Sequence, residues 1–301
     1  MLFAVHIGDG PWDVRWLVGG FLLAAIMLWL STRRLRDEEI PRIALLTAAF
    51  FVASEIRIPV PPTSIHLLLG GLVGVLLGLR AVLAIAIGLL LQALLLQHGG
   101  YYTLGINICV MTVPALLSFG LFRILHRVPW IKHPAAGCLL VAFGAVLWFM
   151  TAVYSLTLVC NTSFTEIEDS ALSIANARLL NPWIIGGALI FAGCVTALER
   201  RLEHTPEFPL GFLVGELSVL LTAALNCVVL LAMGEKTWAT PPLVLVILHL
   251  PFAVVEGVIL GFVVGFLARV KPEMLGIAPA PLPGKVACAV SDDHPTTPFR
   301  A

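Results

Sequence analysis

The chain has 301 residues, of which 59% are hydrophobic and only 12% are charged, and its mean hydropathy is +0.99. Soluble globular proteins contain about a quarter charged residues, so this composition excludes an ordinary soluble protein and indicates a polytopic membrane protein. The 18 basic and 18 acidic residues give a net charge of zero, which argues against nucleic-acid binding by bulk electrostatics. The six cysteines form no CxxC pair and lie mostly in apolar segments, as buried hydrophobic residues do.

Apolar segments of membrane-spanning length recur along the chain and predict an all-α bundle of about nine transmembrane helices. Their expected positions are 14–31, 41–57, 65–79, 81–97, 104–124, 137–158, 183–198, 211–232 and 243–268. The third and fourth segments are short and meet at Gly78-Leu79-Arg80, which suggests a pair of short helices around a protein-lined cavity. We therefore expect one transmembrane domain over residues 5–270. Residues 271–301, rich in Pro and Ala from Ala278 onward, are expected to form a disordered cytoplasmic tail.

Lys and Arg in the short loops predict the orientation, because cytoplasmic loops are enriched in these residues. With the N-terminus outside, twelve basic residues fall at inner loops and inner span ends, and four fall outside. The inner set is Arg33, Arg34, Arg36, Arg42, Arg80, Arg123, Arg127, Lys132, Arg200, Arg201, Arg269 and Lys271, and the outer set is Arg15, Arg57, Arg178 and Lys236. This split predicts an N-out, C-in protein, with His6, His66 and His98 all on the extracytoplasmic face.

Several polar residues in or beside the apolar segments are candidates for chemistry. His98 lies in Gln97-His98-Gly99-Gly100, where a hydrogen-bonded loop histidine and a metal-ligand or access-path histidine are both open interpretations. Glu256 lies near the middle of the last segment, so its carboxylate must face the bundle interior, either on a proton or metal path or as a structural hydrogen-bond anchor. Glycines at a spacing of four, such as Gly70 and Gly74 or Gly257 and Gly261, permit close helix packing, either within the chain or against a partner.

Four motifs occur in order along the chain. They are His6-Ile7-Gly8-Asp9-Gly10; Pro61-Pro62-Thr63-Ser64-Ile65-His66-Leu67-Leu68; Leu91-Gln92-Ala93-Leu94-Leu95 with His98-Gly99-Gly100 and Leu104-Gly105-Ile106-Asn107; and Leu250-Pro251-Phe252-Ala253-Val254-Val255-Glu256-Gly257. In combination they resemble the CbiM/NikM family, the substrate-binding (S) membrane subunits of energy-coupling factor (ECF) transporters for cobalt and nickel. They are similar to its MHIxxG start, its metal-binding helix start, its QALL…GG…LGAN signature and its IPxAxxEG motif. The resemblance implies an ECF S-component-like bundle of seven helices, to which 137–200 adds an inserted helix pair.

The resemblance also implies a ligand set: the N-terminal amine, the amide and ring of the next histidine, and a second histidine. Carried over to this chain, these are the amine of residue 5, His6 and His66. Such a near-planar nitrogen set suits Ni(II) and related ions. Because Met1 to Ala4 precede Val5, and GTG is a bacterial start codon read as methionine, we expect the functional chain to begin at Val5. The residues expected around the metal or along its access path are His98, Asn107, Ser64 and Glu256.

The sequence thus predicts a subunit, without catalytic residues or a permanently bound cofactor, that captures extracytoplasmic Ni(II) or Co(II) for ATP-driven uptake across a bacterial inner membrane. It does not separate nickel from cobalt. The partners that the resemblance implies are a transmembrane coupling (T) subunit, a pair of cytoplasmic ATPases and often a small accessory membrane subunit, in contact with membrane lipid.

Three other functions are open. A secondary metal carrier would work without an ATPase and would need a path lined by charged residues, for which Glu256 and Glu216 are few. An S component for a different small substrate, such as a vitamin, would not need His6. An intramembrane metalloenzyme would need an open coordination position and a general base. The sequence contains no HExxH, GxSxG or GxxxxGK[ST] motif, which disfavours the enzyme.

Overall fold

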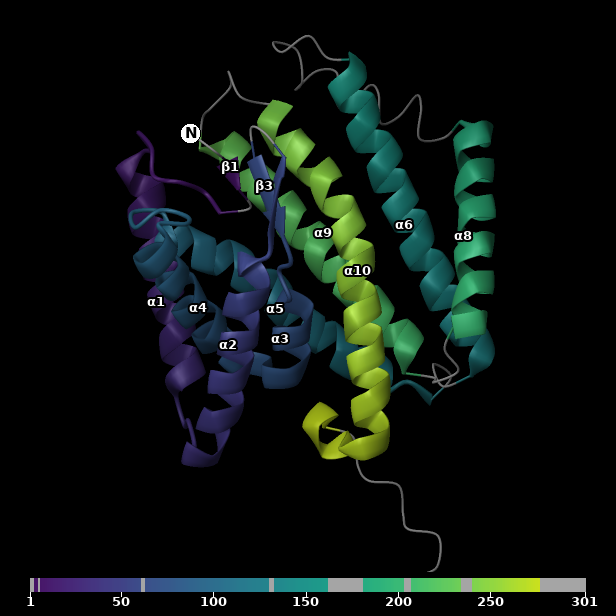
Figure 1. The fold of residues 1–301 in the computed structure, drawn as a ribbon, viewed down its shortest axis with the longest axis horizontal. Coiled ribbons are helices and arrows are strands. Elements are labelled where there is room, and N and C mark those ends of the chain that lie inside the picture. The colour runs from purple at the N-terminus through teal and green to yellow at the C-terminus, as the bar shows by residue number, and fades with distance from the viewer. Residues whose placement is uncertain are drawn as a thin grey trace, which may run out of the picture.

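The computed structural model describes residues 3–4, 6–60, 63–129, 133–161, 181–202, 207–233 and 240–276 (Figure 1). The described helices are α1 (Val14–Thr32), α2 (Ile40–Glu55), α3 (Gly70–Leu77), α4 (Ala81–Leu96), α5 (Leu104–His126), α6 (Pro134–Asn161), α8 (Pro182–Leu202), α9 (Phe208–Ala232) and α10 (Thr240–Val270). Short 3-10 turns lie at η1 (Asp37–Glu39), η2 (Gly78–Arg80) and η5 (Pro272–Leu275). The protein is a helical bundle, as expected from its composition.

Seven helical segments of the described chain are long and apolar enough to cross a membrane. They are Val14–Thr32, Gly70–Leu96, Leu104–His126, Ala135–Thr157, Pro182–Arg200, Phe208–Ala232 and Val244–Val270. The difference from the nine expected spans lies in the first hundred residues. Helix α2 has 16 residues, about 24 Å at the usual rise, whereas a bilayer core is about 30 Å thick. Segments 65–79 and 81–97 form one span interrupted at η2, where the sequence predicts the break.

The expected span at 65–79 is wrong in its first part, because residues 63–66 are extended. Strand β3 (Thr63–His66) is the middle strand of a small sheet, parallel to β1 (Phe3–Ala4) and antiparallel to β2 (Arg57–Val60). Pro59 is tolerated because β2 is an edge strand. The left-handed backbone of Leu69, with φ of 47°, then turns the chain into α3. The prolines before β3 and the turn at Leu69 therefore keep this apolar segment from forming a helix before Gly70.

Glycines let the central helices approach closely, which confirms the internal-packing interpretation for several of them. A Cβ atom on Gly74 of α3 would lie 2.0 Å from the carbonyl oxygen of Ala115 in α5. A Cβ on Gly257 of α10 would lie 2.8 Å from the Phe212 carbonyl oxygen of α9, and one on Gly261 would lie 2.8 Å from the Phe208 ring. These helices form the core beneath the small sheet.

The end of the described chain packs against the bundle, which differs from the tail boundary expected at residue 271. Leu275 in η5 is buried, and the Arg42 guanidinium donates hydrogen bonds to the carbonyl oxygens of Met274, at 2.9 Å, and Leu76. Residues 277–301, the rest of the expected tail, lie outside the described residues. At the bundle's edge, α6 and α8 lie side by side, with α8 outermost (Figure 1).

Candidate metal centre

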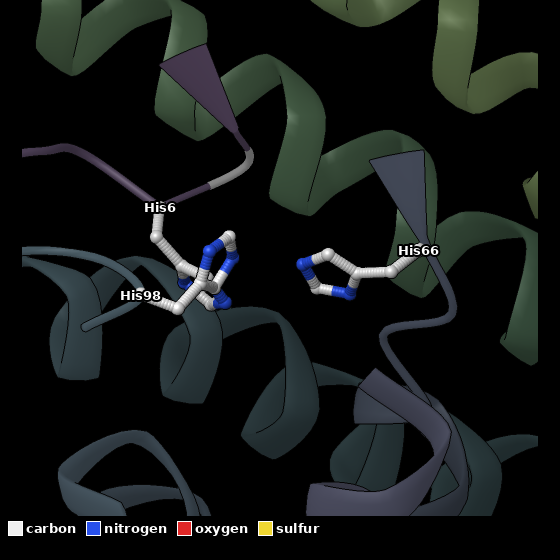
Figure 2. Close-up of side chains that lie close together, drawn as sticks. All are labelled: His6, His66 and His98. Carbon is white, nitrogen blue, oxygen red and sulfur yellow. The ribbon is translucent and has the colours of Figure 1, made fainter. Parts of the chain in front are cut away.

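Three histidines from distant parts of the sequence meet at one end of the bundle. One potential ligand nitrogen from each of His6, His66 and His98 lies within 4.8 Å of the other two. Figure 2 shows the His6 and His98 rings on one side and the His66 ring approaching from the other. His6 and His66 are 2% and 0% exposed, and His98 is half-buried. The cluster is therefore a largely enclosed group of nitrogen donors.

The small sheet sets the register of His6 and His66. Ala4 of β1 pairs with Ser64 of β3, two residues before each histidine. The His6 and His66 rings then stack with centroids 5.2 Å apart and planes 25° apart. His6 and His66, which the loop charges place on one face of the membrane, thus lie side by side. Which membrane face they occupy stays a prediction.

The neighbouring backbone orients the His66 ring. Its Nδ1 lies 2.9 Å from the Leu67 carbonyl oxygen. A carbonyl only accepts, so Nδ1 must carry the proton and donate. The lone pair then lies on Nε2, the nitrogen that would bind a metal, and a contact of this kind is the usual way of fixing a ligating histidine.

Glu256 of α10 holds the segment that follows His66. Its buried carboxylate accepts hydrogen bonds from the backbone N–H groups of Leu68 and Leu69. Leu69 has a positive φ, which is uncommon for leucine, so the contacts around Leu69 must stabilise this backbone conformation. Glu256 therefore acts on the position of His66 through backbone hydrogen bonds.

The side chain of Asn107, near the start of α5, clamps the segment that carries His6. Its Oδ1 accepts the N–H of Ile7 at 2.8 Å, and its Nδ2 donates to the Ile7 carbonyl oxygen at 2.9 Å. Thr103 Oγ1 donates to the same carbonyl oxygen at 2.6 Å. The backbone of Ile7 is thus satisfied as it would be in a sheet, and His6 is fixed beside it.

Asp9 joins the same N-terminal segment to the loop that carries His98. Its carboxylate accepts the backbone N–H groups of Tyr101 and Tyr102, both at 2.9 Å, and of Thr103 at 3.2 Å. An acidic group here also complements the positive end of α5. A Cβ on Gly100 would lie 2.1 Å from Asp9 Oδ1, so this close approach requires glycine.

The other candidates from the sequence occupy different places. Ser64 lies in β3, but its side chain is outside the described residues, as is Val5 altogether. Glu216 points from α9 toward α6, since its Oε2 would lie 2.4 Å from a Cβ on Gly144. Sequence reasoning missed the roles of Asp9 and Thr103. Asp9 is part of the first sequence motif, but the loop residues that it binds are more than ninety positions away, so the sequence alone did not indicate its role.

Comparison with known proteins identifies the class to which this bundle and its histidine cluster belong. The chain is a multi-pass membrane protein, and the family model described as "Cobalt uptake substrate-specific transmembrane region" matches residues 6–201 and 179–274. The chain therefore belongs to the CbiM family, a family of transport proteins rather than enzymes.

Individual relatives agree with this family. A protein of Haemophilus influenzae named as a metal transport protein is 41% identical over 119 residues, covering 40% of this chain and 58% of its own length. The cobalt transport protein CbiM of Geobacter sulfurreducens is 33% identical over 164 residues, 51% of this chain and 46% of that protein. The chain thus spans only about half of these two relatives. A crystal structure of a transition metal transporter aligns with a TM-score of 0.51 at 17% identity, covering 88% of this chain and 93% of that one, which supports the fold alone.

Proposed function

We propose that this chain is the substrate-specific membrane subunit that captures extracytoplasmic Ni(II) or Co(II) for uptake by an ECF-type transporter. The convergence of His6 and His66 carries this proposal, because two buried imidazoles in register offer a metal two neutral nitrogen ligands. Membership in a cobalt uptake family supports a transported ion, rather than a resident cofactor, as the occupant.

The proposed subunit lies N-out, C-in in a bacterial inner membrane, with residues 5–270 as the metal-binding domain and 137–200 as an inserted helix pair. Its partners are a transmembrane coupling subunit and two cytoplasmic ATPases, with a small accessory membrane subunit in some assemblies. Capture precedes transport: the metal exchanges water for protein nitrogens at the outer end, and ATP hydrolysis in the partners drives its release inside.

Additional nitrogen ligands come from the chain before His6 if translation begins at Val5. The free amine of residue 5, the His6 amide and the His6 ring would then form fused chelate rings. N-terminal sequencing of metal-loaded protein purified from membranes tests this start site. A metal-loaded sample that begins at Met1 would exclude the amine of residue 5 as a necessary ligand.

Radioactive Co(II) and Ni(II) uptake by cells tests the function. Cells that express the chain with its coupling subunit and ATPases should accumulate metal, and His6→Ala or His66→Ala should abolish accumulation. His133→Ala is the matched control, since His133 is exposed directly before the first residue of α6 and takes no part in the cluster. Uptake that persists without the ATPases would instead support a secondary carrier. Unchanged uptake in both histidine variants would rule out the proposed site.

A further inference from the structure

The position of His98 suggests more than a loop or access-path residue. We propose that His98 is a third direct ligand of the transported ion, so that His6, His66 and His98 form a three-imidazole site. Such a site takes a divalent first-row metal such as Co(II) whether the chain begins at Met1 or at Val5. The proposal rests on the proposed function and adds to it the ligand that the sequence left open.

The separations of the three rings fit one shared ion. The His98 ring centroid lies 4.9 Å from that of His6 and 5.7 Å from that of His66, with interplanar angles of 85° and 72°. Metal–imidazole bonds of about 2.0–2.1 Å place two nitrogens on one ion roughly 2.8–4.2 Å apart. The three potential ligand nitrogens already lie within 4.8 Å of one another, so small ring rotations bring them to a common point.

The loop around His98 is built against the segment that carries His6. The His98 N–H donates to the Gln92 carbonyl oxygen at 3.2 Å, which ties the residue to the end of α4. Beyond it, Gly99 has φ of 76°, and a Cβ there would lie 3.4 Å from the His6 Cβ. Together with the Asp9 contacts to Tyr101, Tyr102 and Thr103, this fixes His98 beside His6 from both sides.

The residues before His6 lie in the same sheet as His66, which supports a site that works without a free amine at residue 5. Phe3 and Ala4 pair with Thr63 and Ser64. These pairs lie two and three residues before His6 and His66 in their strands, and they help to place the two histidines beside each other. Three imidazoles plus one open position is also a donor set that proteins use for four-coordinate metals.

Visible absorption of Co(II) bound to the full-length chain in detergent provides the test, because its intensity reports coordination number and its charge-transfer bands report thiolate ligands. The variants are His98→Ala and His98→Cys, with His133→Ala and His133→Cys as controls. Size-exclusion profiles and circular dichroism confirm that each variant is folded. The Met1 and Val5 N-termini are compared for the unsubstituted chain.

We expect Co(II) to bind the chain that begins at Met1. His98→Ala should weaken binding by at least the roughly tenfold typical of perturbed metal sites. His98→Cys should add a thiolate-to-cobalt charge-transfer band, which only direct ligation produces, and the His133 variants should match the unsubstituted chain. Co(II) binding restricted to the chain that begins at Val5 would overturn the proposal, as would a folded His98→Cys protein with unchanged affinity and no new band. If His6→Ala and His66→Ala also bind Co(II) normally, the proposed function itself fails.

Discussion

The histidine cluster and the α6–α8 pair are held in the bundle by different kinds of contact. Around the cluster, buried polar side chains bond to backbone groups about a hundred or more residues away, as Asn107 does to Ile7 and Glu256 does to Leu68. The outermost helix, α8, meets α6 through ring packing along its middle, with Phe191 lying 5.4 Å from Trp148 and 5.7 Å from Phe149 between centroids, and through exposed hydrogen bonds from the Arg200 guanidinium to Cys138 Sγ at 2.7 and 2.9 Å. Directional bonds fix the positions of side chains, whereas packing of apolar rings in a membrane fixes only proximity.

This difference implies that metal affinity should respond strongly to changes around the cluster and weakly to changes in the helix pair. The physical basis of this prediction is the short range of metal–ligand bonds. Metal ligands tolerate little displacement, and the contacts that orient them typically affect affinity by about 10–100-fold. Matched substitutions in the two regions therefore test whether they are energetically separate.

The largest contrast is expected between two glycines. Gly74→Leu should abolish the folded state, because even a Cβ would lie 2.0 Å from the Ala115 carbonyl oxygen, between two helix backbones that cannot yield. Gly193→Leu on α8 should leave the protein folded, since a Cβ at this position would have no atom of a neighbouring element within 4 Å. The fraction of monodisperse protein in detergent measures both. Equal losses would show that α8 is as tightly packed as α3.

Two asparagines give the next contrast, this time in metal affinity. Asn107→Leu leaves the buried Ile7 N–H without its acceptor, at a cost of about 1–3 kcal/mol, and releases the His6 segment. Co(II) affinity should then fall by about 10–100-fold. Asn181→Leu removes only an exposed cap at Trp183 N–H of α8 and should leave the affinity unchanged. Calorimetric titration of both variants checks this, and similar losses in the two would contradict it.

Two buried carboxylates, one on α9 and one on α10, sharpen the comparison further. Glu256→Gln replaces one carboxylate oxygen with an NH2 group, which cannot accept from the Leu68 and Leu69 N–H groups, so Co(II) affinity should fall by about tenfold through displacement of His66. Glu216→Gln alters a side chain that faces α6 and should change affinity by less than about twofold. Calorimetric titration with Co(II) measures both variants. A larger loss of affinity in Glu216→Gln than in Glu256→Gln would show that α6 contributes to the site.

The sequence predicted the helical bundle, the break at Gly78 and the shared face of His6 and His66, because composition, glycine and loop charge are local signals. It did not predict the small sheet, since the segment from residue 65 to 79 is apolar enough for a membrane helix, and only tertiary contacts select the extended form of its first residues. It left His98 open and missed Asp9, because their contacts join segments some ninety residues apart. The ligand roles of Val5, His6 and His66 stay predictions.

The smallest effect on metal binding is expected from loosening α8 itself. Phe191→Ala removes the ring that stacks on Trp148, a contact worth about 0.5–1.5 kcal/mol beyond its buried area, so the thermal midpoint should fall by a few degrees. Co(II) affinity should stay within about twofold of the unsubstituted chain, because no described hydrogen bond of the cluster passes through α8. Phe50→Ala, in the core beneath the sheet, is the control that should lower both stability and affinity. If Phe191→Ala weakened Co(II) binding as much as Phe50→Ala, the helix pair would be part of the machinery that shapes the site, and the separation argued from the two kinds of contact would fail.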